Sequence, residues 1–189
     1  MAVFPGKSDG ALEASFEILN QLQELNRNRG GDDSVLAGIG LHTGSVMLGT
    51  IGNEARMEGT VISDVVNVAS RIESLTRFYD STLLVSKPTI NGATKTLNNR
   101  YLGKVQVKGK TNKVEIFEIL GNSITDRAKL DSKQSFEEGL NLFFDQKFAE
   151  ASVHFSRVAE DNSTDRAARI YLERSADYMV NGVPSDWEA

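Results

Sequence analysis

The sequence predicts an α+β protein in which helices cover a mixed sheet and an α-helical extension follows at the C-terminal end. Over the first 120 residues, segments of strand length alternate with amphipathic segments of helical spacing. After Gly121 the apolar spacing is helical throughout. The chain has 189 residues, of which 40% are apolar and 25% charged, so it is long enough for one well-buried domain and a smaller appendage.

The first elements expected are a short strand over residues 1–6 and a helix from residue 8 or 9 to about residue 28. The apolar residues of this helix that we expect to face the core are Leu12, Phe16, Leu19, Leu22 and Leu25. Residues 35–42 and 46–51 are rich in β-forming side chains, and Gly44-Ser45 between them has the composition of a two-residue turn. We therefore expect these two segments to pair as an antiparallel hairpin.

A helix over residues 64–78 is the element on which the functional interpretation rests. Its apolar side chains fall on one face, at positions i, i+3, i+7 and i+10: Val65, Val68, Ile72 and Leu75. This face is expected to pack against a sheet. Asn67, Arg71 and Ser74 form a second stripe at i, i+4 and i+7, so that an amide and a guanidinium project side by side. From spacing alone, the simplest interpretation of such a stripe is a solvated polar face.

The elements expected next complete the sheet. Residues 81–86 form a strand, and Lys87-Pro88 begins a short helix, because proline suits the first helical turn. Residues 100–108 and 114–120 alternate apolar and polar side chains enough to form a closing hairpin. These strands and the two long helices together give the predicted α+β sandwich.

The C-terminal part is predicted to be a linker, residues 121–132, and a helical tail, residues 133–183. Small and aromatic residues of the tail have the spacing of a tetratricopeptide helix pair: Gly139, Leu142, Phe148, Ala151, Phe155 and Val158. Residues 145–147 form the turn, and residues 165–180 add a third helix. Its residues expected to face inward are Ala168, Tyr171, Leu172 and Met179. Single repeats need neighbours to bury their faces, so the tail is either a helical cap on the sheet or a peptide-binding module.

Composition excludes several kinds of site. The net charge of −5 argues against a general nucleic-acid or anionic-membrane binder. The chain has no cysteine, so neither disulfides nor cysteine catalysis can operate, and a reducing cytoplasm is compatible. No apolar run approaches the ~20 residues of a membrane helix, and no signal-peptide pattern opens the chain. We therefore expect a cytoplasmic location.

The residues of the polar helix carry a family resemblance. Residues 61–73, VISDVVNVASRIE, resemble the signature of class III nucleotide cyclases, the adenylyl and guanylyl cyclases. Residues 38–44 and 49–52 are similar to the family's preceding hairpin, and residues 107–110 are similar to its late phosphate-binding strand. The resemblance covers roughly residues 1–120 and has one departure, since Ser63 stands where the family usually has glycine.

The resemblance implies a ferredoxin-like nucleotide cyclase sandwich that converts a nucleoside triphosphate to a 3′,5′-cyclic nucleotide and pyrophosphate, at sites shared across a head-to-tail dimer. By position, Asn67 would orient the ribose and Arg71 would bind the reacting phosphate. Lys108 would contact the terminal phosphates, and Thr60 would contact the purine. A hydroxyl can hydrogen-bond either purine, so ATP is favoured over GTP only because some bacterial ATP cyclases have threonine there.

The resemblance also implies Mg²⁺ or Mn²⁺, held in the family by two aspartates that no residue here matches. The family strand similar to residues 1–5 follows directly after the second of them, so the sequence resembles a cyclase domain that lacks its N-terminal part. We therefore expect this chain to be inactive alone, and to work as a homodimer or paired with another cyclase domain. The alternatives are a non-catalytic homologue that binds a nucleotide or regulates a partner, and an interaction protein whose functional part is the helical tail.

Overall fold

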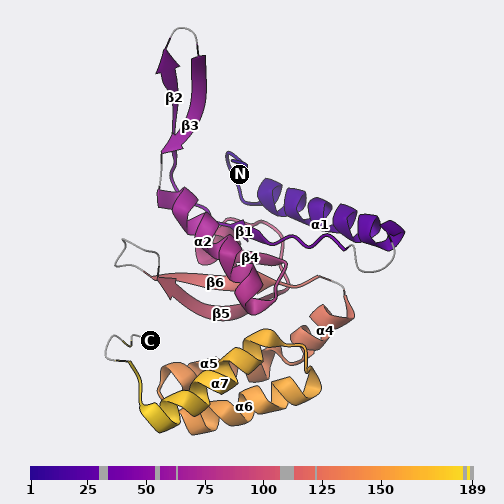
Figure 1. Ribbon diagram of the computed structural model, residues 1–189, viewed down its shortest axis with the longest axis vertical. Helices are drawn as coiled ribbons and strands as arrows, with labels where there is room; N and C mark the ends of the chain where they lie inside the picture. The colour runs from indigo at the N-terminus through magenta and orange to yellow at the C-terminus, as the bar shows by residue number, and fades with distance from the viewer. Residues whose placement is uncertain are drawn as a thin grey trace. The chain divides into compact units, whose positions relative to one another are not determined.

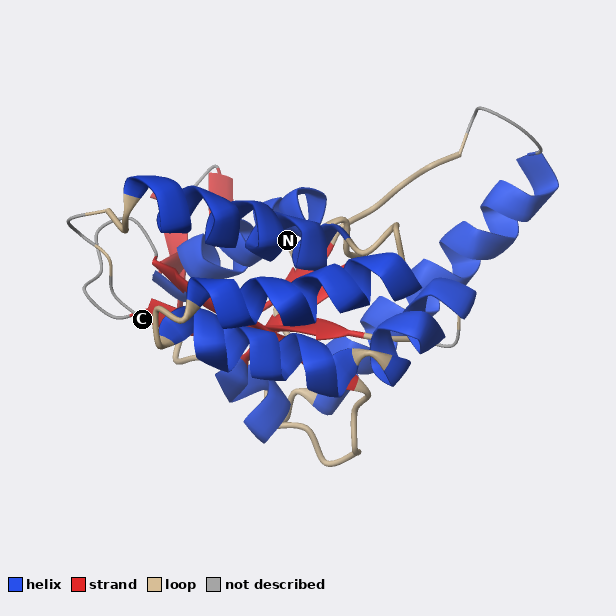
Figure 2. Ribbon diagram, turned by 90° about the horizontal axis from the view of Figure 1, so that it is seen from below, coloured by secondary structure: helices blue, strands red, loops and turns tan. Residues whose placement is uncertain are grey.

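The computed structural model describes residues 1–29, 34–53, 56–62, 64–106, 113–121, 123–184 and 187. These residues form two compact units: Met1–Leu97 with Lys104–Phe117, and Asn98–Gly103 with Glu118–Ala189. Strands β5 (Asn99–Gln106) and β6 (Lys113–Ile119) therefore contribute to both units. The strands are short beside the helices, which make up most of the regular structure (Figures 1 and 2).

The main sheet has four strands in the order β1-β4-β6-β5. Strand β1 (Ile39–Leu41) runs parallel to β4 (Leu83–Ser86), with Ile39 opposite Leu83. Every residue of β4 is buried, as expected for a central strand with a continuous apolar run. A mixed sheet with covering helices confirms the predicted α+β fold class.

The first unit contains α1 (Asp9–Arg29), α2 (Asp64–Tyr79) and α3 (Lys87–Asn91), so the three helices predicted here are confirmed. Leu12 is buried on α1, whereas Leu25, which we expected in the core, is 40% exposed. The carboxylate of Asp9 accepts hydrogen bonds from the backbone nitrogen of Thr94, at 2.9 Å, and from its hydroxyl. The backbone hydrogen bond in particular lowers the pKa of Asp9.

Two predictions for the first 62 residues are wrong. Residues 1–5 form no strand, and the large apolar side chains there, Met1, Val3 and Phe4, are exposed. Residues 39–41 do not pair with the segment that follows them. That segment, β2 (Met47–Asn53), instead pairs antiparallel with β3 (Arg56–Ile62) in a separate sheet, with the turn between them outside the described residues. Strand-forming composition indicates a strand but does not identify its partner, which for β1 lies some forty residues later.

The first helix of the second unit is α4 (Ile124–Asp131), where we predicted a linker. The hydroxyl of Ser123 accepts a hydrogen bond from the backbone nitrogen of Asp126 at 3.0 Å and donates one to its carboxylate at 2.7 Å. This cap starts a helix whose apolar period is too weak to reveal it. Lys129 on α4 is nevertheless buried, which a polar linker would not explain.

The remaining helices are α5 (Lys133–Phe144), α6 (Phe148–Asp161) and α7 (Arg166–Asn181), and they pack side by side (Figure 1). The predicted helices and the turn at residues 145–147 are confirmed. A Cβ atom on Gly139 would lie 3.0 Å from the side chains of both His154 and Phe155, so this glycine lets α5 and α6 approach closely. Tyr171 is buried as expected, whereas Met179 is 49% exposed.

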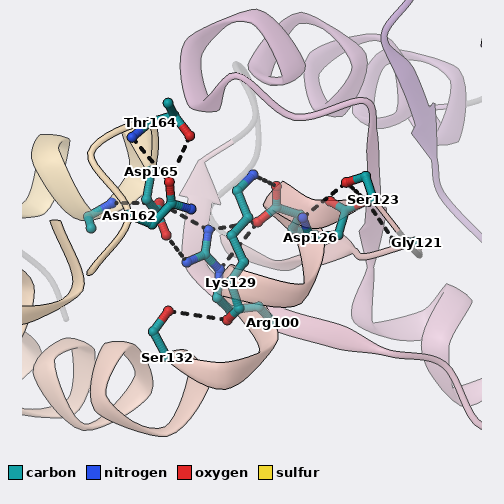
Figure 3. Close-up of polar contacts among 11 residues, drawn as sticks. Arg100, Gly121, Ser123, Asp126, Lys129, Ser132, Asn162, Thr164 and Asp165 are labelled. Atoms are coloured by element: carbon teal, nitrogen blue, oxygen red, sulfur yellow. Dashed lines mark hydrogen bonds and ion pairs between the residues drawn. The ribbon is translucent and has the colours of Figure 1, made fainter. Parts of the chain in front are cut away.

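A buried charge cluster, defined as Arg100, Glu118, Lys129 and Asp165, ties these helices to the strand segments of the second unit (Figure 3). The guanidinium of Arg100 donates to both carboxylates, including at 2.8 Å to Glu118. Lys129 donates to the other oxygen of Glu118 at 2.6 Å. Burial alone would lower the pKa of Arg100, but the two carboxylates outweigh it and raise that pKa. Two cations facing two anions make the cluster neutral, which is the condition for burying it.

The strand backbone in this unit is also held by side chains from the helices. The backbone nitrogen of Tyr101 donates to the carboxylate of Glu137 at 3.0 Å, and the hydroxyl of Tyr171 donates to the backbone oxygen of Leu102 at 2.6 Å. Strand β5 is last in the order of the sheet, so these contacts satisfy backbone groups of an edge strand. The helices therefore pack against residues 98–103 of the same unit, which is the arrangement expected of a helical cap.

Replacing Asp165 with asparagine is expected to lower the free energy of unfolding by about 3 kcal/mol, near the lower end of the cost of removing one partner from a buried ion pair. The asparagine oxygen can still accept the hydrogen bond from the backbone nitrogen of Ala168 that caps α7, so the lost charge is the main change. Urea unfolding measures the effect. Asp161→Asn, at an exposed site on α6, is the control and should change stability by less than about 0.5 kcal/mol. Equal stability of the two variants would contradict the burial of an uncompensated charge.

Candidate functional site

Helix α2 lies against β1 at two glycines. A Cβ atom on Gly40 would lie 2.7 Å from the backbone oxygen of Ala69, and one on Gly38 would lie 2.8 Å from the Cβ of Thr76. Real Cβ atoms do not make such contacts, so these glycines allow the helix backbone to approach the strand. Val68 and Ile72, at 1% and 0% exposure, fill the interface, which confirms the predicted packing face.

The side of α2 next to this buried face carries Asn67, Arg71 and Ser74, and all three are exposed. The hydroxyl of Ser74 donates to the backbone oxygen of Ser70 at 3.0 Å, so it is engaged with its own helix. Asn67 and Arg71 are one turn apart, about 6 Å along the axis, so they lie on the same side of the helix. The arrangement presents an amide and a guanidinium to solvent from a rigid element.

The loop after β1 contacts the first turn of α2. A Cβ atom on Gly44 would lie 2.6 Å from a methyl group of Val65, which is two residues before Asn67. Asp64 begins the helix and is exposed, and Ser63 lies outside the described residues. The position of this loop therefore affects where the helix begins.

A chain of hydrogen-bonded side chains fixes the same loop, and sequence reasoning did not find it. A ring nitrogen of His42 lies 2.8 Å from the hydroxyl of Ser86, which is fully buried at the end of β4. Thr89 lies 3.1 Å from both Ser86 and Thr43, and Ser8 lies 3.2 Å from Thr43, hydroxyl to hydroxyl. The signal available was the hydroxyl residues after two strands, whose ends meet because β1 and β4 are parallel.

The other two predicted site residues lie wholly or partly outside the described residues. Thr60 lies on β3 opposite Gly49 of β2, but its side chain is outside what the structure describes. Lys108 lies in residues 107–112, which are also outside the described residues. The structure thus places Asn67 and Arg71 together and leaves Thr60 and Lys108 as sequence predictions.

A metal site needs several acidic, histidine or cysteine side chains to converge on one point. In the described part of the chain, no group of three or more histidine, cysteine, aspartate or glutamate side chains could hold a metal ion. The described residues therefore offer no cluster of three or more such ligands to the divalent ions that the family resemblance implies. No helix in the same ranges is long and apolar enough to cross a membrane.

Comparisons with known proteins agree with the motif. The family model described as "Adenylate and Guanylate cyclase catalytic domain" matches residues 9–121. The chain is 29% identical over 184 residues to "Adenylate cyclase, terminal-differentiation specific" of Dictyostelium discoideum, covering 92% of this chain and 9% of that protein. It is 36% identical over 129 residues to an adenylate cyclase of Anabaena cylindrica, covering 63% of this chain and 26% of that protein. The chain thus spans a small part of these relatives' length.

A solved adenylyl cyclase structure is also similar to this chain in fold. The model superposes on the structure of a bacterial light-regulated adenylyl cyclase with a TM-score of 0.50 and 29% sequence identity. The match covers 59% of this chain and 32% of that chain. The likeness in fold therefore extends over about the same share of the sequence as the predicted resemblance.

Replacing Gly40 with alanine is expected to push α2 away from β1, because the new methyl group would overlap helix backbone that cannot rotate away. Overpacking of this kind costs about 1–3 kcal/mol or more in free energy of unfolding, which urea titration would measure. Gly49→Ala is the matched control, since a Cβ atom there meets nothing within 4 Å. Two variants of unchanged stability would show that the helix does not depend on the glycine.

Proposed function

Because this chain belongs to the adenylate and guanylate cyclase catalytic domain family, we propose that it contributes one half of a composite site that converts ATP to 3′,5′-cyclic AMP and pyrophosphate. The observation that carries the proposal is the exposed pair Asn67 and Arg71 on α2, held by the buried contact of the same helix with β1. Both residues lie within the matched region 9–121.

The chemistry suits these two residue types. Attack of the ribose 3′-oxygen on the α-phosphate forms one P–O bond, breaks another and releases pyrophosphate, while negative charge builds on the phosphate oxygens. A guanidinium offers a planar set of donors to those oxygens and stays charged at every physiological pH, so Arg71 is assigned to the reacting phosphate. The amide of Asn67 can both donate and accept a hydrogen bond, so it is assigned to the ribose.

Two further residues complete the proposed nucleotide contacts. Lys108 is assigned to the terminal phosphates, where a flexible point charge can follow an oxygen that moves during the reaction. Thr60 is assigned to the purine, with ATP favoured over GTP. Both assignments rest on family motif positions, supported by relatives named adenylate cyclases.

The missing half of the site would come from a second cyclase domain. The family is generally metal-dependent, and the described residues of this chain do not fit a metal, so we propose that the partner domain carries both metal-binding aspartates. The partner would be a second cyclase domain in a head-to-tail dimer in the cytoplasm. The tetratricopeptide-like helices α5 and α6 would accompany this half-site without taking part in the reaction.

Replacing Arg71 with alanine is expected to lower turnover roughly 10²- to 10³-fold, the usual cost of removing a preorganised transition-state donor, with much less effect on ATP binding. The assay pairs this chain with a cyclase domain that keeps both metal aspartates but has its own asparagine and arginine replaced. Arg77→Ala, exposed near the end of the same helix, is the control and should leave turnover unchanged.

The outcomes of this assay separate the alternatives. Cyclic AMP formed by the purified chain alone would refute the half-site. An active pair that is indifferent to Arg71→Ala would show that the exposed stripe was wrongly assigned. A pair inactive even with the unmodified chain would support the non-catalytic regulatory alternative.

Replacing Lys108 with alanine is expected to weaken ATP binding about tenfold or more, because one charge-assisted contact is worth roughly 1.5 kcal/mol or more. Turnover at saturating ATP should fall little, since the terminal phosphates are contacted in both the ground and transition states. Equilibrium dialysis with labelled ATP on the same pair measures the affinity, with Lys104→Ala on β5 as the control. A loss confined to turnover would assign Lys108 to the reacting phosphate instead.

A further inference from the structure

An aromatic seat lies where the ends of three helices of the second unit meet. We define it as Phe143 near the end of α5, Phe148 at the start of α6 and Tyr178 near the end of α7. Phe143 and Phe148 are 5.3 Å apart between ring centroids, and Phe148 and Tyr178 are 5.4 Å apart. Phe143 and Phe148 are buried, whereas Tyr178 is half-buried, so Tyr178 is the member of the seat that solvent reaches.

The indole of Trp187 occupies this seat. Its ring centroid lies 5.3 Å from those of Phe143 and Tyr178 and 6.0 Å from that of Phe148. The interplanar angles are 64°, 81° and 86° respectively, so each pair meets edge to face, the arrangement that aromatic rings prefer. Three such contacts to one side chain form a specific recognition site for a large aromatic ring.

Among the described residues of the segment that carries Trp187, its indole makes the aromatic contacts with the helices. Helix α7 stops at Gly182, whose φ of 75° reverses the chain direction at a residue without a Cβ. The backbone nitrogen of Trp187 donates to the oxygen of Pro184 at 2.9 Å, which closes a turn within the segment itself. Among residues 183, 184 and 187, those of the segment that are described, no hydrogen bond to the helices is formed. An indole on another peptide would therefore find the same contacts.

A short tether gives Trp187 an advantage over any such peptide. The link from the end of α7 is only a few residues long, and short flexible links produce effective concentrations on the order of millimolar. A free peptide that offers only the same indole must exceed that concentration to displace it. A partner that adds contacts beyond the indole, or that holds its peptide close, can compete at lower concentration.

We propose that the seat is a docking site for a partner peptide that presents a tryptophan, and that Trp187 occupies it in cis as a tethered competitor. The helical tail thereby has a binding function separate from nucleotide chemistry. Binding of the partner and release of Trp187 are one exchange, so the environment of Trp187 reports directly on the state of the site.

The chain offers a direct test because Trp187 is its only tryptophan. The probe is the peptide acetyl-GVPSDWEA-amide, which copies residues 182–189. In the full chain carrying Trp187→Ala, all indole fluorescence comes from the probe, and its emission should shift to the blue and saturate on titration. The unmodified chain, followed by calorimetry, should bind the probe at least tenfold more weakly. The same peptide with alanine in place of tryptophan is the control ligand and should not bind.

Variants of α7 test whether the seat is the site. Adding Tyr178→Ala to Trp187→Ala should weaken probe binding at least tenfold, whereas adding Met179→Ala, at the neighbouring exposed position, should not. If Trp187→Ala does not fold by circular dichroism, Trp187→Phe replaces it, because the smaller ring is a weaker competitor. A folded variant that does not bind the probe at 10 mM, about ten times the order of the tether's effective concentration, would overturn the proposal. Equal binding of the alanine peptide would do the same.

Discussion

The close contact between α2 and β1 is the constraint on which the candidate site depends. Gly40 lets the helix backbone approach the strand, and a side chain there would collide with the backbone oxygen of Ala69. Because successive residues of a helix are about 100° apart, burying Val68 and Ile72 leaves the preceding residues, Asn67 and Arg71, exposed beside the buried face. The direction of the functional groups is therefore set by packing that they do not take part in.

Sequence reasoning succeeded where the information was local. Helical periodicity predicted α2 and its buried face, and the proline at the start of α3 predicted that helix. It failed for the partner of β1, because the composition of a strand is the same whether it pairs with the next strand or with a distant one. It also expected the apolar residues of α1 to face the core as far as Leu25, which is exposed.

The second unit shows a different limit. Arg100, Glu118 and Asp165 are charged residues far apart in the sequence, and charged side chains are normally exposed. Only the fold shows that they meet and neutralise one another, so the sequence predicted a linker at α4 and left the helical tail as either a cap on the sheet or a peptide-binding module. A buried cluster of this kind contributes less to stability than its contacts suggest, yet it strongly penalises any arrangement that separates the charges. The cluster thereby fixes the position of α4 and of the start of α7 relative to the strand residues Arg100 and Glu118.

The buried and exposed sides of α2 constrain the sequence in different ways. This explains why two residues of the site could be supported by helix geometry and the other two could not. The buried face requires small and branched apolar residues at fixed spacing, which any helix on a sheet would show. The exposed side accepts most polar residues at little cost in stability, so packing does not select the asparagine and the arginine there. Preorganised donors are effective because the helix has already lost its freedom on folding, and no further ordering is needed when charge develops. The side chain of Thr60 and the whole of Lys108 lie outside the described residues, so both assignments rest on motif position alone. Those of Asn67 and Arg71 rest also on the geometry of the helix that carries them.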